Sequence, residues 1–362
     1  MKKLFVHVGY HKTGTTWLQN NIFDEHPDIN FLGKGKLCRT APGLLSIIRN
    51  LQDADSLFDA EKNRQTLRSA LEKQCCLPNH KIIGVSAEGL SGGYDWFGCN
   101  SGTIAQRIKD VFCDYDVKII IGIREQTDMI SSLYSQYLKR GGTNTLKRLL
   151  ESPFSEGRIM KKKCEYVGLI NNYYALFGED RVFVYLYEEF RADKQVVINR
   201  ITDYLSIDRY VVSAKASNKN PNPRPSRLSL VVLRILNHFF YSRHNNNIFI
   251  LLPLTLIIGF FVSCLLRLKI TRKFYPKARL IDQFQNYYER EQFLSERIRS
   301  FVKLVLFRVD AYSFGLCKRF RYTLSADLRL KLQEIYGQTN NELAEAIHKD
   351  VKKYGYSVAE SA

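Results

Sequence analysis

The residues best suited to chemistry lie near the start of the chain, in a loop rich in glycine and threonine. Gly9 and Gly14 have the spacing of the phosphate-binding loop G-x-x-x-x-G-K-[ST], but threonine stands at the lysine position and the lysine is Lys12, inside the loop. Thr15 and Thr16 add two hydroxyl groups. Because the N–H groups and the dipole of a following helix also attract anions, this stretch predicts a phosphate site.

The displaced lysine indicates which phosphate compound the loop suits. A nucleoside triphosphatase needs lysine on the β and γ phosphates and a hydroxyl on Mg²⁺, because its leaving group is highly charged. A donor with one phosphate and one sulfuryl group carries less charge and can react without the metal. A single lysine near its bridging oxygen, Lys12, could then be sufficient. We therefore expect no metal at this loop.

A second candidate anion site follows the most apolar strand of the chain. Residues 117–123 are a continuous apolar run, as in a parallel strand buried on both faces, and Arg124 follows them. Ser132 stands eight residues after Arg124, with Ser131 as the alternative hydroxyl. Arginine offers a bidentate, charge-assisted fork to an anion, and serine adds one donor. A magnesium-dependent P-loop enzyme would place aspartate at this strand end.

Glu88 is the candidate general base. It follows an apolar strand predicted over residues 81–86 and leads into the glycine-rich segment 89–93. Open α/β sheets bind ligands at the carboxyl ends of their strands, so a carboxylate there could accept a proton from a substrate hydroxyl. His11, next to Lys12, is the competing base.

At these residues the sequence resembles the sulfotransferases that use 3′-phosphoadenosine 5′-phosphosulfate (PAPS). Their loop for the 5′-phosphosulfate has the form K-x-G-T-T-x-L, and the same pattern runs here from Lys12 to Leu18. The resemblance implies PAPS as co-substrate, no metal, and transfer of the sulfuryl group to an acceptor hydroxyl. The implied donor-binding residues of the loop are His11, Lys12, Thr13, Gly14, Thr15, Thr16 and Trp17.

The resemblance also gives roles to residues outside the loop. Arg124 and Ser132 match the family's pair for the 3′-phosphate of the donor. The proline-rich segment 215–227 stands where the family has a loop over the adenine and the 3′-phosphate. Arg227 is the better match to the arginine of that loop, and Arg224 is the alternative.

The catalytic residues implied in this way are Lys12 and Glu88. Glutamate as the base resembles the branch of the family that acts on carbohydrates more than the branch that acts on phenols and steroids, which uses histidine. We therefore expect a carbohydrate or glycolipid acceptor. Two other interpretations stay open: a P-loop kinase of a nucleotide or metabolite, and a non-catalytic membrane-associated protein with a nucleotide fold.

The elements that must position these residues alternate along the chain. Strands are expected in five apolar segments, at residues 3–8, 29–32, 81–86, 117–123 and 181–187. Helical spacing is expected between them. The alternation predicts an α/β fold of the P-loop type, with three layers and a central, mainly parallel sheet.

The charge distribution predicts how the chain is divided. Its 362 residues have a net charge of +18, and residues 224–321 hold 18 Lys and Arg against 5 Asp and Glu. We therefore expect a catalytic domain over 1–223, a helical, basic insertion over 224–321 and a C-terminal segment, 322–362, whose helix completes the catalytic domain. The basic insertion suits a membrane surface, and nucleic acid is not the expected partner.

Residues 248–266 form a 19-residue run without a charge, followed by a basic cluster at 267–279. The length of the run meets the requirement for a spanning helix. A single crossing would separate the last helix from the catalytic domain, so we expect a monotopic hairpin at the membrane surface within 228–321. The alternatives are a helix buried in the protein or in an oligomer interface, and a single-pass protein.

The cysteines and the N-terminus predict the compartment. The eight cysteines show no metal-binding spacing, and we interpret them as free thiols. No signal peptide precedes the first expected strand. Both features indicate a cytoplasmic location for the catalytic part.

Overall fold

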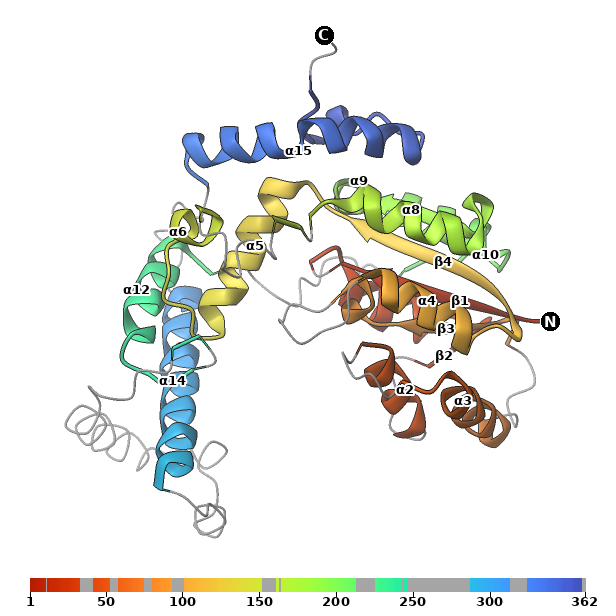
Figure 1. The fold of residues 1–362 in the computed structure, drawn as a ribbon, viewed down its shortest axis with the longest axis horizontal. Helices are drawn as coiled ribbons and strands as arrows, with labels where there is room; N and C mark the ends of the chain where they lie inside the picture. The colour runs from red at the N-terminus through yellow and green to blue at the C-terminus, as the bar shows by residue number, and fades with distance from the viewer. Residues whose placement is uncertain are drawn as a thin grey trace. The chain divides into compact units, whose positions relative to one another are not determined.

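The protein is described by a computed structural model, and the chain folds into two compact units (Figure 1). Unit 1 comprises Met1–Met129, Ile159–Pro221 and Ala326–Ala362, and unit 2 comprises Ile130–Arg158 and Asn222–Ser325. The described residues are 1–10, 12–32, 42–52, 58–74, 80–92, 101–151, 161–162, 164–212, 225–242, 244–245, 287–312 and 324–359.

Unit 1 is built on a five-stranded sheet in which all the described strands run parallel. The strands are β1 Lys2–Gly9, β2 Ile29–Phe31, β3 Ile82–Ser86, β4 Tyr115–Ile123 and β5 Val182–Leu186. Their order across the sheet is β2-β3-β1-β4-β5. The prediction of an α/β fold with a parallel central sheet is confirmed.

The chain leaves β1 and β4 in opposite directions across the sheet. From β1 it continues to β2 on one side, and from β4 it continues to β5 on the other side. The two strands end at the same level, because Gly9 is paired with Gly122. Ligands of open parallel sheets bind at the carboxyl ends of such a pair of strands. The loops that follow β1 and β4 therefore lie where a nucleotide-like ligand is expected.

Helices follow most strands of unit 1. They are α1 Thr15–Leu18, a π-helical turn Gln19–Phe23, α2 Pro42–Gln52, α3 Ala60–Gln74, α4 Ser101–Val111, α8 Tyr166–Phe177, α9 Tyr187–Ala192, α10 Lys194–Leu205 and α15 Ala326–Ala346. Short 3₁₀ turns lie at Glu88–Ser91, Glu179–Arg181 and Lys352–Tyr354. Asp193 begins α10, where its carboxylate accepts hydrogen bonds from the backbone N–H groups of Gln195 and Val196.

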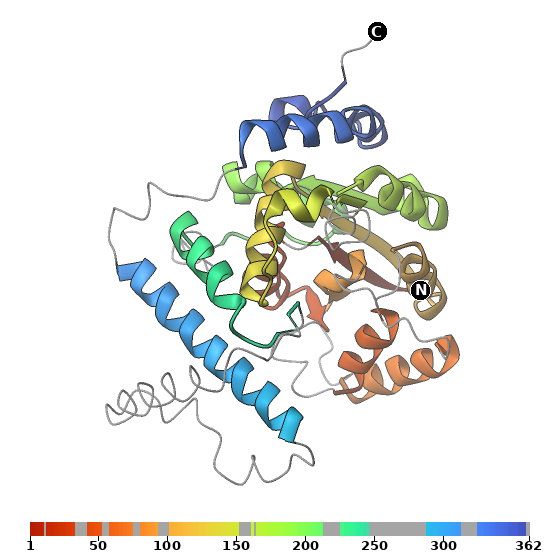
Figure 2. The same cartoon turned by 60° about the vertical axis from the view of Figure 1, so that its left-hand side comes forward.

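The helices cover the sheet with apolar side chains. Phe5 of β1, Phe23 of the π-helical turn and Leu205 of α10 belong to one buried cluster on one side of the sheet. The helix α15 lies along α8 (Figures 1 and 2), and the Tyr174 hydroxyl donates a 2.9 Å hydrogen bond to the Ala346 carbonyl. The last described helix is thus tied to unit 1, although it is distant from the sheet in sequence.

Unit 2 contains helices from both of its segments. They are most of α5 Gln126–Lys139, then α6 Leu146–Glu151, α12 Arg227–Asn237 and α14 Tyr287–Tyr312. The Asn237 side chain joins two of its segments by donating 2.8 Å hydrogen bonds to the carbonyls of Leu138 and Gly142. Residues 130–158, which the sequence analysis placed in the catalytic domain, belong to this unit.

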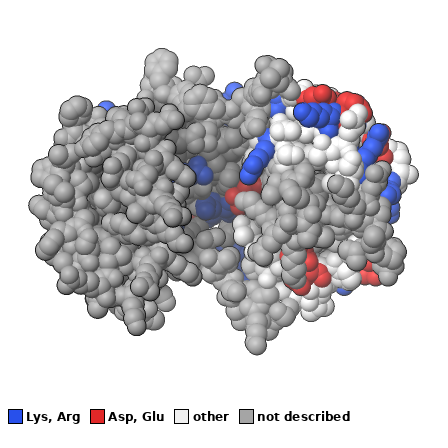
Figure 3. All heavy atoms as spheres, turned by 90° about the horizontal axis from the view of Figure 1, so that it is seen from below, with Lys and Arg blue, Asp and Glu red and all other residues white. Residues whose placement is uncertain are grey.

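The membrane prediction falls largely outside the described residues. Neither the uncharged run 248–266 nor the basic cluster 267–279 is described. Within the part of the chain that is described, no helix is long and apolar enough to cross a membrane. On the face drawn in Figure 3, basic and acidic side chains of described residues lie among one another. Cys113 and Cys164 form no disulfide bond with each other, and the other six cysteines lie outside the described residues.

Candidate functional site

The loop after β1 is held closed by hydrogen bonds inside it. Thr13 Oγ1 donates to the carbonyl of Tyr10 over 2.6 Å, and Thr15 Oγ1 donates to the same carbonyl over 3.3 Å. A Cβ atom on Gly9 would lie 2.2 Å from Thr15 Oγ1, closer than atoms can approach. Glycine at position 9 therefore allows the loop to fold back tightly onto the end of its strand.

Two residues of the loop have left-handed backbone angles. Gly14 has φ of 89° and Lys12 has φ of 69°. A Cβ atom on Gly14 would also lie 2.7 Å from the ring of Phe190. The left-handed conformation costs about 1–3 kcal/mol for a residue other than glycine, and such strain is concentrated at functional sites. Lys12, the proposed catalytic lysine, is thus held in an unusual conformation.

The carbonyl groups of the loop bond to the body of unit 1. The Lys12 carbonyl accepts a 3.3 Å hydrogen bond from Arg124 Nη1, and the Thr13 carbonyl accepts a 3.1 Å hydrogen bond from the Tyr185 hydroxyl. In a planar trans peptide the N–H points opposite to the C=O. The N–H groups of Thr13 and Gly14 therefore point away from Arg124 and Tyr185, as required of a loop that binds an anion with its backbone.

Arg124 stands at the end of β4 with its guanidinium group buried. Its side chain is 2% exposed, its Nη2 atom lies 2.6 Å from Asp128 Oδ2, and its guanidinium carbon lies 4.7 Å from the centre of the Tyr187 ring. Its Nε atom is buried and has no hydrogen-bond partner among the described residues. A buried donor left unpaired costs about 1–3 kcal/mol, so a bound anion that accepted this hydrogen bond would stabilise the site.

Glu88 lies beside the loop between β1 and α1, which is called the donor loop below. It is the first residue of the 3₁₀ turn after β3, and β3 is the neighbour of β1 in the sheet. Thr16 Oγ1 lies 3.4 Å from Glu88 Oε1 and donates to it. The structure thus brings the proposed base to the loop that contains Lys12. His11 lies outside the described residues, so the choice between the two bases stays a prediction.

The structure also describes Trp17, Ser132 and Arg227, three further residues predicted from the sequence. The Trp17 ring packs in the core, where its centre lies 5.3 Å from that of Phe190. Ser132, with its alternative Ser131, is on the part of α5 that belongs to unit 2, and the exposed Arg227 is the first residue of α12 in the same unit. Arg224 is outside the described residues.

Sequence reasoning missed several polar residues next to Arg124. Glu188 follows β5, and its carboxylate accepts hydrogen bonds from the Glu125 backbone N–H and the Tyr356 hydroxyl over 3.2 and 3.3 Å. Burial raises the pKa of Glu188, and the N–H of Glu125 and the charge of Arg124 act against this shift. The repeated glutamate after the fifth strand was the only sequence signal for this residue. Its contact with Tyr356 depends on the fold and could not be read from spacing.

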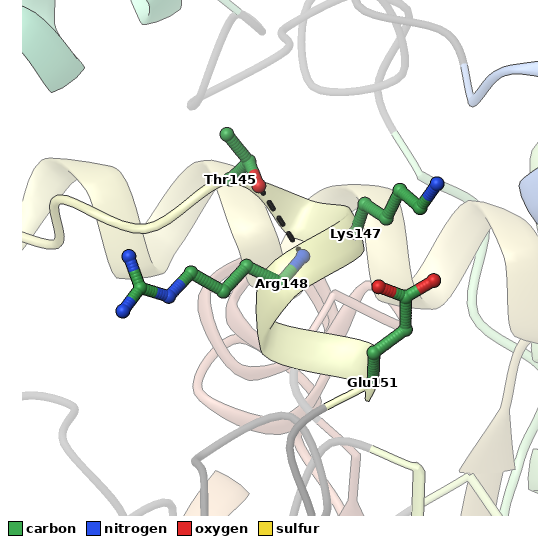
Figure 4. A pocket seen from close by; sticks show the side chains of 4 residues that line it. All are labelled: Thr145, Lys147, Arg148 and Glu151. Atoms are coloured by element: carbon green, nitrogen blue, oxygen red, sulfur yellow. Dashed lines mark hydrogen bonds between the residues drawn. The ribbon is translucent and has the colours of Figure 1, made fainter.

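Surface cavities of about 460 and 380 Å³ lie in the described part of unit 2. The larger is lined by residues of α6 and α12, including Arg148, Arg234 and His238. The smaller lies on α6, where Figure 4 shows Lys147 and Glu151 on one side of the helix and Arg148 on the other. None of the donor-loop residues lines either cavity. The candidate site is therefore located by its chemistry and not by the size of a pocket. Among the described residues, no group of His, Cys, Asp and Glu could hold a metal ion.

Comparison with known proteins gave matches among solved structures only. No family model matches the sequence, and no curated protein matches it. A sulfotransferase from Alicyclobacillus acidocaldarius matches at 18% identity and a TM-score of 0.43, over 66% of this chain and 93% of that chain. A mouse sulfotransferase complexed with 3′-phosphoadenosine 5′-phosphate (PAP) matches at 17% identity and a TM-score of 0.33, over 60% of this chain and 64% of that chain. In its donor-loop motif and in the solved structures that it matches, the chain is thus similar to sulfotransferases.

Proposed function

We propose that this chain is a sulfotransferase that moves a sulfuryl group from PAPS to an acceptor hydroxyl. The observation that supports this most strongly is the hydrogen bond between Arg124 and the carbonyl of Lys12. It joins the two strand ends to which the sequence assigns the two phosphates of the donor. A P-loop kinase would be expected to have a carboxylate for Mg²⁺ at the second strand end, where this chain has an arginine.

The donor would lie across the carboxyl ends of β1 and β4. The backbone N–H groups of Thr13 and Gly14, with the first N–H groups of the helical segment Thr15–Phe23, would bind the 5′-phosphosulfate. Arg124 would bind the 3′-phosphate through the Nε atom that lacks a partner among the described residues. Asp128 neutralises Arg124 in the structure, and a phosphate would compete with its carboxylate. Ser132 and Arg227, which belong to unit 2, stay predictions from the sequence as further ligands of the 3′-phosphate.

The reaction needs one charge stabiliser and one base. The acceptor oxygen forms a bond to sulfur while the bond from sulfur to the bridging oxygen breaks, which leaves PAP. Lys12 stabilises the negative charge that develops on the bridging oxygen. Glu88 accepts the proton of the hydroxyl. The hydrogen bond from Thr16 to Glu88 supports this pairing, because it places the carboxylate at the loop that contains Lys12.

We infer a carbohydrate or glycolipid as the acceptor. Sugar hydroxyls are weak acids, so their transfer chemistry requires a positioned base. The half-buried Glu88 is a carboxylate in that place. This acceptor class depends on Glu88 being the base, and a phenol, which loses its proton more readily, would depend on the base less.

We also propose that the chain works on the cytoplasmic side of a membrane surface, as a peripheral or monotopic protein. The sequence support is the uncharged run 248–266 and the basic residues around it. In unit 2, α12 exposes three apolar side chains with helical spacing, Leu228, Val231 and Ile235. Arg234 lies on the same helix. Exposed apolar and basic side chains on one helix are typical of contact with anionic lipid.

The proposed activity is tested by ligand binding before any acceptor is known. Thermal unfolding should be shifted upward by PAP, and less by adenosine 5′-monophosphate, because only PAP has a 3′-phosphate for Arg124. Arg124→Gln is the matched variant, in which the difference between the two ligands should disappear. Stabilisation by ATP with Mg²⁺ and not by PAP would contradict the proposal and favour a kinase. Stabilisation by neither nucleotide would favour the non-catalytic interpretation.

A further inference from the structure

A chain of buried hydrogen bonds lies behind the donor loop. Gln19 Nε2 lies 3.0 Å from Ser86 Oγ, and Ser86 Oγ lies 2.8 Å from His7 Nδ1. His7 Nε2 lies 3.3 Å from the Tyr185 hydroxyl, which lies 3.1 Å from the Thr13 carbonyl. All five residues are at most 5% exposed. The chain of contacts therefore begins on the helical turn after the loop and ends on the loop itself.

The directions of these hydrogen bonds follow from the end at Thr13 and from the charge of His7. Gln19 Nε2 can only donate, and it also donates to the Ser86 carbonyl over 3.1 Å, whereas the Thr13 carbonyl can only accept. His7 Nε2–H must donate to the Tyr185 oxygen, because the Tyr185 proton is used on Thr13. A neutral imidazole has only this one proton, so its Nδ1 accepts the hydrogen bond from the Ser86 hydroxyl. An imidazolium would instead donate from Nδ1 to the second lone pair of Ser86 Oγ, so the directions depend on the charge of His7.

Burial keeps the imidazole neutral. Desolvation lowers the pKa of His7 to about 3, and the negative charge of Glu88 acts against this shift. Burial also raises the pKa of Tyr185, so its hydroxyl keeps its proton. Both groups are therefore neutral across the physiological range, and the hydrogen bonds keep one direction.

The path of these hydrogen bonds explains why β4 has a glycine at position 122. His7 lies on β1 and Tyr185 on β5, with β4 between them in the sheet. A Cβ atom on Gly122 of β4 would lie 2.3 Å from the Tyr185 hydroxyl. The absence of a side chain at Gly122 lets the Tyr185 ring reach across β4 to the loop. Ser86, the partner of His7 on β3, stands two residues before Glu88.

We propose that His7 and Tyr185 are positioning residues for sulfuryl transfer. Tyr185 fixes the Thr13 carbonyl and thereby the direction of the Gly14 N–H that faces the donor, while His7 sets the Tyr185 hydroxyl and joins it to the strand end before Glu88. In this way the donor phosphosulfate and the base are held at a fixed position relative to each other. The proposal rests on the proposed function, because it concerns the geometry of that reaction.

The test compares variants of the hydrogen-bonded residues with a control variant at another buried histidine, His26. Tyr185→Phe removes one hydroxyl and leaves the Thr13 carbonyl without this donor. Turnover with PAPS should fall about tenfold to a hundredfold, as expected of small displacements at a reacting centre. The control is His26→Gln. His26 is also buried, and it bonds to the carbonyl of Asp208 and the N–H of Asp28, just before the start of β2. This control should unfold more easily and keep its turnover per folded molecule.

His7 is tested by partial rescue. The amide nitrogen of glutamine can donate to the Tyr185 oxygen as Nε2 does, and leucine cannot. His7→Gln should therefore be more active than His7→Leu, and His7→Leu should add little to Tyr185→Phe, because the loss of the Tyr185 hydroxyl already removes the group that His7 orients. Equal loss in His7→Gln and His7→Leu would contradict the proposed role of the Nε2 donor.

The outcomes separate this proposal from the proposed function. If the unaltered chain neither binds PAP nor transfers sulfate, the proposed function fails and the positioning role fails with it. If the unaltered chain is active, and Tyr185→Phe and His7→Leu lose only stability as His26→Gln does, the network holds the fold alone and the positioning role is wrong.

Discussion

Lys12 and Arg124 touch the same loop but should contribute to different steps of the reaction. Lys12 is proposed to lie at the bridging oxygen, where charge would develop only in the transition state, so Lys12→Ala should lower kcat by about 10²–10³. Arg124 is proposed to bind the remote 3′-phosphate, so Arg124→Gln should first weaken the binding of PAP. Steady-state kinetics with PAPS and calorimetry with PAP measure the two effects. Full turnover by Lys12→Ala would contradict its role, and so would an activity that requires Mg²⁺.

Glu88 has a sharper test, because glutamine keeps its shape and removes its basicity. Glu88→Gln should bind PAP as the unaltered chain does and lose about 10²–10⁴ in turnover on an alcohol acceptor. Single-turnover measurements with bound PAPS separate this step from donor binding. Normal turnover by Glu88→Gln, together with loss in His11→Ala, would assign the base to His11 and remove the main support for a carbohydrate acceptor.

His7 predicts how the stability of unit 1 depends on pH. Its pKa is about 3 in the folded chain and 6.5 in the unfolded chain, so between these values the unfolded chain binds a proton that the folded chain does not. The free energy of unfolding should therefore fall as the pH falls from 6.5 toward 3. His7→Gln should reduce this dependence, as measured by urea unfolding at a series of pH values. An unchanged slope would mean that His7 is not buried as a neutral imidazole.

At the scale of elements, strands and long helices were predictable from the sequence, and their contacts were not. The strands β1 and β4 are mostly apolar because helices cover both faces of the sheet, and this pattern is visible in one sequence. The π-helical turn Gln19–Phe23 and the short helix α9 have no comparable periodicity. The reach of Tyr185 across Gly122 depends on which strands are neighbours, and the order of strands is not encoded in any local pattern.

Gly122 allows a prediction about strand β4. Alanine at this position would force the Tyr185 ring away, because its Cβ atom would lie 2.3 Å from the hydroxyl. Gly122→Ala should lower turnover as Tyr185→Phe does and also destabilise unit 1 by about 1–3 kcal/mol through overpacking. Gly168→Ala is the matched control, because a Cβ atom there meets no atom within 4 Å and alanine favours the helix α8. Equal turnover in Gly122→Ala and the control would mean that the ring has room to move.

At the scale of the whole molecule, the chain is expected to bind anionic membranes through unit 2. Vesicles containing phosphatidylserine should carry the protein upward in a flotation gradient, and neutral vesicles should do so less, because basic side chains add about 1 kcal/mol each near anionic lipid. Deleting residues 246–286 should abolish flotation. Flotation that is independent of lipid charge and of this deletion would contradict the proposed surface. Recovery of all the protein in the soluble fraction of cells would favour a buried or interfacial helix.

The hydrogen bond from Arg124 to the carbonyl of Lys12 has a consequence for the choice of donor. In the proposed complex, one guanidinium group would contact the loop for the sulfuryl end and would also bind the 3′-phosphate, so the two ends of the nucleotide would be recognised together. Adenosine 5′-phosphosulfate, which lacks the 3′-phosphate, would leave Arg124 paired with Asp128 and would lose affinity and alignment at once. The same arrangement would hold the spent nucleotide, because PAP keeps both phosphates. The rate at which PAP leaves would then set the pace of successive turnovers.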